Sequence, residues 1–565
     1  MATESIETFN VDWSNKYGFY AVAAKDLQAG DIVIHENPFA FQIFPEFQGK
    51  MCEACFKQSG DKVSMSRCSR CKQVCYCSRE CQTQHWNLIH KLECKVFEQS
   101  DPEFLTDTPR ILFRSYLKIM SMIQIDSEKQ SGNKKKKGLN FQVPQDIHSR
   151  WQPSAAQLQK MNSSAIPRTH IHSFTDYLNL ISDIDKPTGF HAQQLNADCS
   201  RLLRYMNIDP TSQAKYYQNA TAIEEAVEIF RKCANNMANN IQLSSGQNII
   251  TTYPRFSLFN HSCHPNIKHT CFQDGSIQGV AVTNIPKGQP LLISYILQKL
   301  PFSIRQKQLL QWKFCCRCQR CTSNIEGQVV LKEMEKEKKQ GLKINKYKDY
   351  KFPPDMYIEA FVCKCGNPLF RVYQNAQQVT VDGNWNQINQ PYYYLCQKCL
   401  IPCLQSESEQ TEINYCLSCV EEQQKANQIH AFQRHLKRIG GKFPLFHPFS
   451  CVYNIILDQQ VKDFKRNGDL DNALSIGSKL VENIEYAWDR VPNRECADIY
   501  CDQGNMSCEL KHLPQAYKYL TKAKEQLNIL FSKSDDKDMK FMLLMCKKNI
   551  ELIKYSCHVR NIPLD

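Results

Sequence analysis

The sequence predicts an α+β protein built from several domains, and three observations lead to this prediction. The chain has 565 residues, which is too many for a single hydrophobic core. Cysteine pairs with metal-ligand spacing recur along it, and its last part has apolar residues at helical spacing. A Pro-x-Gly turn that leads into an apolar strand at 286–293 indicates a β-rich region between them.

Composition limits the class of protein. The net charge of +13 is modest for this length and does not by itself indicate nucleic-acid binding. No run of 18 apolar residues occurs, so we expect no membrane span. The first residues lack the charged and apolar regions of a secretory signal. We therefore expect a cytoplasmic or nuclear protein whose 29 cysteines are metal ligands and buried thiols rather than disulfides.

The densest motif lies at 52–94, where eight Cys or His residues with metal-ligand spacing fall within 43 positions. A structural zinc ion takes four such ligands, so eight ligands predict two zinc sites. The segment is too short to bury a core of its own, and metal binding would supply its folding free energy. Spare thiols are the alternative, and the regular spacing argues against them.

This segment resembles the MYND zinc finger, because Tyr76 precedes Cys77 and the window closes as Trp86-x3-His90-x3-Cys94. The resemblance implies two interleaved sites. Their ligands would be Cys52, Cys55, Cys77 and Cys81 in one, and Cys68, Cys71, His90 and Cys94 in the other. Cys75 and His85 fall outside the pattern. The local charge of +5 over 50–95 suits an acidic peptide or nucleic acid, and a merely solvated face explains it equally well.

A second constellation consists of residues 257–266, which contain Asn-His-Ser-Cys, and residues 285–295, which end in Ile-Ser-Tyr. Each alone is an ordinary turn or strand. Together, in this order and spacing, they resemble the SET domain of protein lysine methyltransferases. Residues 15–34 resemble the first hairpin of that domain. Its usual Gly-x-Gly element would bring Lys16, Tyr17 and Gly18 to the cofactor, although Lys16 replaces the first glycine.

The SET resemblance implies S-adenosylmethionine as cofactor and assigns roles to several residues. Asn260 and His261 would hold the cofactor, with Ser257 beside them. Tyr295 would be the catalytic tyrosine, aimed at the methyl group and the target amine. Phe314 would stack near the adenine or form a wall of the lysine channel. For Tyr295 the alternative is a half-buried tyrosine with only a packing role.

A further cofactor-binding asparagine is expected shortly before the Asn-His-Ser motif. Asn239 aligns best, although Ala238 stands where the family often has cysteine. Asn236 or Asn240 could take the role instead. These residues fall at the end of a stretch, 218–243, for which the apolar spacing predicts a helix.

Two more cysteine groups predict further zinc sites. Cys316, Cys318 and Cys321 supply three ligands, and the family resemblance provides Cys263 as the fourth, with Cys315 left over. Farther on, two Cys pairs flanked by aromatic residues predict a zinc ribbon. Its ligands would be Cys363, Cys365, Cys396 and Cys399, although the pair Cys416 and Cys419 could replace one of these pairs. We therefore expect three zinc ions, and a fourth in the ribbon.

The C-terminal part predicts helical hairpins. Leu470-x2-Ala473 recurs as Leu513-x2-Ala516, each followed by apolar residues seven and eleven positions after the alanine. Such spacing suits irregular tetratricopeptide-like repeats. A simple antiparallel helical bundle is the alternative.

The order of these motifs is similar to the split arrangement of the SET-and-MYND lysine methyltransferases, in particular the longer members with a Cys-rich insert. The implied fold is a SET β-core split by a MYND finger and a helical insertion. The expected segments are 1–48 (SET N-terminal part), 49–96 (MYND finger), 97–250 (helical insertion), 251–300 (SET core), 301–324 (post-SET zinc region), 325–425 (Cys-rich insert) and 426–565 (C-terminal helical repeats).

The family resemblance implies an S-adenosylmethionine-dependent protein lysine N-methyltransferase that acts on histone or non-histone proteins. The partners would be a protein with an exposed lysine and, through the finger, a proline-rich or acidic peptide. DNA is a weaker alternative, and we expect a monomer without membrane contact. The alternative from another class is an inactive scaffold that binds partner proteins through the finger and the helical repeats.

Overall fold

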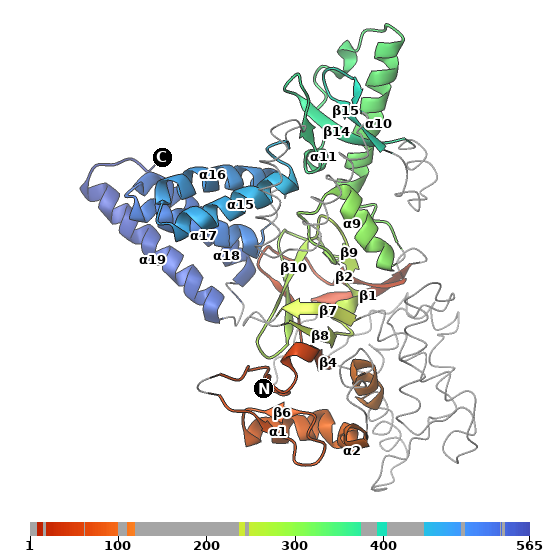
Figure 1. Cartoon of the computed structure of the whole chain (residues 1–565), viewed down its shortest axis with the longest axis vertical. Helices are drawn as coiled ribbons and strands as arrows, with labels where there is room; N and C mark the ends of the chain where they lie inside the picture. Colours follow the sequence, from red (N-terminus) through yellow and green to blue (C-terminus); the bar gives the residue numbers. More distant parts are fainter. Residues whose placement is uncertain are drawn as a thin grey trace, which may run out of the picture.

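The computed structural model describes residues 8–14, 18–60, 63–99, 110–118, 237–242, 248–312, 314–374, 392–403, 446–487, 492–531, 533 and 537–564. These residues form a mixed helix-and-sheet protein with four visible parts (Figure 1). A β-rich region lies at the centre, the finger lies below it, and a helix-and-sheet insert lies above it. The helices of the C-terminal part stand to one side of it. No helix among the described residues is long and apolar enough to cross a membrane.

The central β-region joins segments that are far apart in the sequence. β3 (Ile32–Glu36) pairs with β11 (Ile277–Ala281), which pairs with β10 (Ile267–Cys271). β4 (Ala40–Ile43) pairs with β8 (Asn248–Thr252). The pairings of β3 with β11 and of β4 with β8 each span more than 200 residues, so the N-terminal strands and the strands after residue 247 form one body. A hairpin of β1 (Phe9–Ser14) and β2 (Gly18–Ala23) lies beside it, and Leu27, Phe259 and Ile277 belong to the shared core.

One helical expectation was wrong. Residues 237–242, which lie within the stretch predicted to be helical, form strand β7 (Met237–Gln242). β7 pairs antiparallel with β8, so backbone pairing with a neighbouring strand overrides the local helical pattern. Residues 218–236, which carry the rest of that prediction, lie outside the described residues.

The finger consists of a small hairpin and a broken helix. β5 (Ser66–Arg67) pairs with β6 (Cys75–Tyr76), and a short 3-10 turn at Pro45–Phe47 precedes them. Helix α1 (Arg79–His85) begins at the cap Ser78, whose hydroxyl accepts a hydrogen bond from the Cys81 backbone at 3.2 Å. A π-helical turn, η2 (Trp86–His90), follows and runs into α2 (Lys91–Gln99). Helical residues 110–118 pack against the finger.

The insert combines a long helix with a small sheet. Its helices are α9 (Phe302–Leu309), η5 (Leu310–Trp312), α10 (Gln319–Lys339), η6 (Asn345–Tyr347) and α11 (Pro354–Tyr357). Its sheet has the order β13 (Phe361–Val362), β14 (Pro368–Tyr373), β15 (Tyr392–Cys396) and β16 (Pro402–Cys403). α10 runs straight across the boundary expected between 324 and 325, so the third cysteine group and the insert share a helix.

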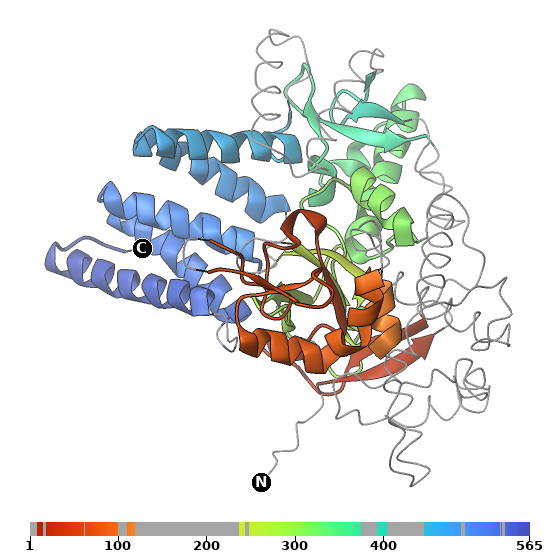
Figure 2. The ribbon, with the colours of Figure 1, turned by 60° about the horizontal axis from the view of Figure 1, so that its bottom comes forward.

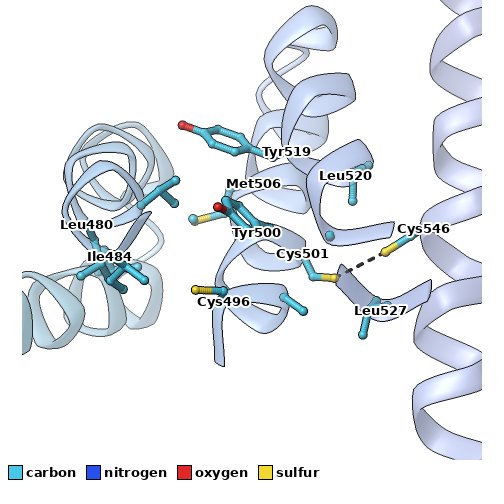
Figure 3. Packing of buried hydrophobic residues seen from close by; sticks show 14 of the residues in the cluster. Leu480, Ile484, Cys496, Tyr500, Cys501, Met506, Tyr519, Leu520, Leu527 and Cys546 are labelled. Carbon is cyan, nitrogen blue, oxygen red and sulfur yellow. Dashed lines mark hydrogen bonds between the residues drawn. The ribbon is translucent and has the colours of Figure 1, made fainter. Parts of the chain in front are cut away.

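The C-terminal region is helical, as predicted. It contains α15 (Cys451–Arg466), α16 (Leu470–Ala487), α17 (Arg494–Glu509), α18 (Leu513–Phe531) and α19 (Lys537–Val559). Helices adjacent in sequence pack together, and both views show them as a stack with α19 on its outside (Figures 1 and 2). Ala473 and Ala516 are fully buried, which allows close approach of the helices, and Leu480 and Leu527 fill the interior (Figure 3).

Candidate active site and metal clusters

The two motifs that resemble a SET domain lie side by side in the central β-region. β9 (Asn260–His261) and β12 (Leu292–Ile293) run parallel, with Asn260 opposite Leu292. The Asn266 side chain stabilises this pairing. It accepts a hydrogen bond from the Leu292 backbone at 2.7 Å and donates one to the Pro290 carbonyl at 2.9 Å. This pairing places the residues after β12 directly beside those of β9.

Hydrogen bonds hold Tyr295 at both of its ends. Its backbone N–H donates to His261 Nδ1 at 3.0 Å, and its hydroxyl donates to the Phe259 carbonyl at 2.9 Å. The His261 and Trp312 rings lie 5.4 and 5.2 Å from the Tyr295 ring, between centroids. Desolvation by these neighbours raises the pKa of the Tyr295 hydroxyl, so the hydroxyl stays protonated and neutral.

Asn260 and Phe314 complete this group. The Phe314 ring lies 5.9 Å from His261 and 6.4 Å from Tyr295. The half-buried Asn260 side chain makes no hydrogen bond to the residues that the structure describes. An amide without a partner among the described residues fits a ligand with polar groups, and the neighbouring rings of His261, Tyr295 and Phe314 fit one with a flat base, as S-adenosylmethionine has. Sequence reasoning missed Trp312, whose only signal was its position two residues before Phe314.

For the other predicted cofactor residues that it describes, the structure gives mainly the position in the fold. Ser257 lies on the 3-10 turn η4 (Phe256–Leu258) that leads into β9. Gly18 begins β2 opposite Ser14, whereas Lys16 and Tyr17 lie outside the described residues. Asn239 lies in β7 where the pairing with β8 shifts register, and Asn240 shares this irregularity. The side chains of β7 are not described, so the structure does not distinguish these two asparagines.

The third cysteine group forms a compact cluster next to the active-site candidate. The sulfur atoms of Cys263, Cys316, Cys318 and Cys321 lie within 4.8 Å of one another, although Cys263 is far away in sequence. The Cys263 and Cys321 sulfurs are 3.5 Å apart. Zn–S bonds of about 2.3 Å place tetrahedral sulfurs about 3.8 Å apart, so the four residues fit a zinc ion. His261 Nε2 lies 3.3 Å from the Cys263 sulfur.

Polar groups from α9 contact these sulfurs. Arg305 Nε lies 3.3 Å from the Cys263 sulfur, and Gln306 Nε2 lies 3.2 Å from that of Cys321. Arg305 also pairs with the buried carboxylate of Asp355 at 2.7 Å. Such donors offset the negative charge of metal-bound thiolates and fix their orientation. Sequence reasoning missed all three residues because they carry no motif and reach the cluster only through packing.

The finger holds two interleaved clusters with the ligand sets implied by the resemblance. One comprises Cys52, Cys55, Cys77 and Cys81, and the other comprises Cys68, Cys71, His90 and Cys94. In the first, the Cys55–Cys77 and Cys77–Cys81 sulfur distances are 3.5 and 3.6 Å. In the second, the Cys68 and Cys94 sulfurs lie 3.9 Å apart, and His90 Nε2 lies 3.6 Å from the Cys71 sulfur. These separations suit tetrahedral zinc.

The two residues expected to stand outside the pattern have other contacts. The Cys75 thiol donates to the Met51 carbonyl at 3.1 Å, and burial raises its pKa to about 11. His85 Nδ1 lies 3.0 Å from the Tyr76 hydroxyl, and burial lowers the pKa of His85 to about 3. His85 is therefore a neutral core histidine that stacks on His90, with ring centroids 5.5 Å apart.

A buried charge network connects the second finger cluster to the central β-region. His90 Nδ1 lies 3.0 Å from Glu93, and Arg114 pairs with Glu93 at 2.7 Å and with Glu53 at 3.0 Å. Arg114 also donates to the Phe41 carbonyl in β4 at 2.9 Å. Burial alone would raise the pKa of the Glu93 carboxyl, but the Arg114 guanidinium holds it well below its usual range. Glu93 thus stays charged and orients His90.

The insert carries the fourth cluster, formed by Cys363, Cys365, Cys396 and Cys399. Its first two cysteines lie in the turn between β13 and β14, and the last two lie at the end of β15. The Cys365 and Cys396 sulfurs are 3.5 Å apart, a separation that fits zinc. Cys365 is exposed. Cys416 and Cys419, the alternative ligand pair, lie outside the described residues.

Comparison with known proteins identifies the relatives of this chain. Residues 52–94 match the MYND finger family. The human histone-lysine N-methyltransferase SMYD3 is 26% identical over 328 residues, which cover 57% of this chain and 64% of that protein. The chain is a relative of the SET-and-MYND proteins. The resemblance read from the motifs is thereby confirmed.

Other SET-and-MYND relatives agree with this placement. The Arabidopsis thaliana histone-lysine N-methyltransferase ASHR1 is 26% identical over 54% of this chain and 55% of its own length. The bovine N-lysine methyltransferase SMYD2 is 24% identical over 53% of this chain and 57% of its own length. The matched segments thus span somewhat more than half the length of these relatives.

Proposed function

We propose that this chain is an S-adenosylmethionine-dependent protein lysine N-methyltransferase. One observation supports this proposal most directly. Asn260, His261 and Tyr295 come together where β9 pairs with β12. The relatives named as lysine methyltransferases support the same activity. They do not favour the alternative of an inactive scaffold.

Asn260 and His261 would hold the cofactor, with Asn239, Ser257 and the Lys16–Gly18 backbone as further contacts. When bound, S-adenosylmethionine supplies an activated methyl group for in-line displacement by a lysine amine. Tyr295 would contribute a neutral hydroxyl at a fixed position, because the Phe259 carbonyl and the His261 ring restrain it. Trp312 and Phe314 would exclude water from the reacting groups. Catalysis would thus rest on positioning rather than on acid–base chemistry.

The four cysteine-rich clusters would each bind a structural zinc ion, two in the finger, one beside the active site and one in the insert. The cluster of Cys263, Cys316, Cys318 and Cys321 would anchor the segment that carries Phe314. The split arrangement, from the SET N-terminal part at 1–48 to helical repeats at 426–565, is part of this proposal. The pairings of β3 and β4 with strands after residue 247 support it.

The substrate would be an exposed lysine of a histone or non-histone protein in the cytoplasm or nucleus. MYND fingers imply protein interactions, and here the partner would be a proline-rich or acidic peptide. DNA binding is a weaker proposal because it rests only on the local charge of the finger. We propose a monomer as the active form.

Labelled S-adenosylmethionine tests this function. The purified chain, the Tyr295→Phe variant and a matched Tyr347→Phe control would each be incubated with a whole-cell extract. We expect label on protein, a fall of at least about 100-fold for Tyr295→Phe, and no change for the control, whose hydroxyl lies in the insert near Glu333 and Glu337. Zinc content checks that each variant is folded.

Calorimetry with S-adenosylmethionine separates binding from transfer. We expect Asn260→Ala to weaken binding of the cofactor, since the amide is one of its proposed contacts. No label and no cofactor binding by a fully zinc-loaded chain would refute the enzyme.

A further inference from the structure

Helix α19 has two apolar faces, and only one of them has a partner among the described residues. On the inner face Met539, Leu543, Cys546, Ile550 and Ile553 are each at most 5% exposed and belong to the core of the helical stack. Figure 3 shows Cys546 pointing from this helix toward Cys501 of α17, and their sulfurs lie 3.4 Å apart. This face explains why α19 belongs to the stack.

The opposite face is a row of exposed apolar side chains, which we call the outer seam. Ten large hydrophobic side chains are exposed in the described part of the protein, and six of them lie on α19. Their exposed fractions range from 38 to 70%. They are Phe541, Leu544, Met545, Leu552, Tyr555 and Val559. Isolated exposed residues of this kind are ordinary, whereas a continuous row is typical of an interaction surface.

The spacing of the outer seam is that of a coiled coil. Positions 541, 545, 548, 552, 555 and 559 alternate in steps of four and three, and all but one are apolar. The exception is Lys548, which is exposed near the middle of the seam. The row spans roughly 27 Å at 1.5 Å per residue, enough for a partner helix of about three heptads. The outer helix of a repeat stack usually has a polar face, so this seam is unusual.

The charged residues of α19 indicate which kind of partner helix fits the outer seam. α19 has five lysines and two acidic residues. Lys540, Lys547 and Lys554 recur every seven residues and line one edge of the seam. Glu551 pairs with Lys554 at 3.0 Å, so these two charges offset each other and Lys540 and Lys547 remain as the excess along this edge. The seam is therefore apolar with a basic edge.

α18 lies beside the lysine edge of the seam, and the charges between the two helices balance. Lys524, Glu525 and Asn528 of α18 line a groove of about 460 Å³ with Lys547, Ile550 and Glu551 of α19, so two lysines and two glutamates face it. Lys547 and Lys548 have no ion pair within the described part of the chain. A second copy of this helix would bring basic edges together and would bury Lys548 without a carboxylate, which is costly.

We propose that the outer seam of α19 binds an acidic amphipathic helix of another protein. The partner helix has apolar residues in four–three spacing, Asp or Glu along its flanks, and one acidic residue in its seam opposite Lys548. Burial of the apolar row supplies the affinity, while the pairing with Lys548 sets the register. This surface lies on the outside of the stack, and the proposal does not depend on the methyltransferase activity.

Binding of synthetic helices to the full chain tests this surface. The acidic probe has three heptads with leucines in four–three spacing, glutamates on its flanks and one glutamate in the seam. The basic probe replaces all glutamates with lysines. We expect fluorescence anisotropy to give at least tenfold tighter binding of the acidic probe. Leu552→Glu lowers this binding at least tenfold, while Leu342→Glu, an exposed leucine beyond the end of α10, leaves it unchanged.

A swap of the seam charge tests the register. Lys548→Leu weakens binding of the acidic probe and strengthens binding of a probe in which leucine replaces the seam glutamate. Equal binding of both probes, or no effect of Leu552→Glu in a chain whose helical circular dichroism is intact, overturns the proposal. Sedimentation of the free chain tests whether a second copy of the chain occupies the seam. A dimer that Leu552→Glu dissociates makes a second copy the occupant, which also overturns it.

Discussion

The second finger cluster and the insert cluster hold the same number of ligands, yet they differ in how the fold surrounds them. Cys68, Cys71, His90 and Cys94 are all buried, whereas in the insert cluster only Cys396 is buried and Cys365 is exposed. Behind His90 stands Glu93, which Arg114 ties to the central β-region. No described carboxylate lies in a comparable position in the insert cluster. Ligand spacing makes both sites possible, but only the surrounding contacts join a site to the rest of the fold.

The largest effect should come from Arg114, because it neutralises two buried carboxylates at once. We expect Arg114→Met to lower the free energy of unfolding by about 3–5 kcal/mol, since it leaves Glu93 without its cation and Glu53 with Arg110 alone. Denaturant unfolding of the zinc-loaded chain measures this. Arg70→Met is the matched control on the finger, because Arg70 pairs with Glu98 at the surface. An equal loss in both variants would contradict the structural role of the buried network.

Removing the charge behind His90 should have a smaller effect. We expect Glu93→Gln to lower zinc affinity of the finger by about 10- to 100-fold, because the histidine loses the carboxylate that orients its ring. Competition with a zinc-binding dye measures this affinity. Glu98→Gln, on the same helix but at the surface, should leave zinc affinity unchanged. If both variants bound zinc as tightly as the unaltered chain, Glu93 would not act on the metal ligand.

The same contrast explains what could be predicted from the sequence. The four groups of Cys and His residues that the structure brings together were predicted, three from their spacing together with the family resemblance and the insert group from its spacing. Arg114, Glu93 and Arg305 could not be predicted as positioning residues, since each acts on a cluster through folding and none belongs to a motif. Strand β7 was predicted as the end of a helix from the apolar spacing of the stretch 218–243, and its pairing with β8 decides otherwise. Local patterns therefore locate the ligands, and long-range packing determines what surrounds them.

The smallest global effect should come from the insert cluster. We expect Cys365→Ser to remove one zinc ion per chain, because one of four ligands is lost, while methyl transfer and the three other ions are retained. Elemental analysis with the labelling assay measures both. Cys508→Ser, a half-buried thiol of α17 outside the clusters, is the control for loss of a thiol.

A chelator applied to the unaltered chain sharpens the comparison further. The exposed Cys365 gives the chelator direct access to the insert cluster, whereas the second finger cluster opens only if the Glu93–Arg114 network separates. We therefore expect zinc to leave in a fast phase of one ion followed by slower phases, and Cys365→Ser to abolish the fast phase. A single uniform phase, or a fast phase that persists in this variant, would show that the contacts around a cluster do not control how firmly it holds its metal.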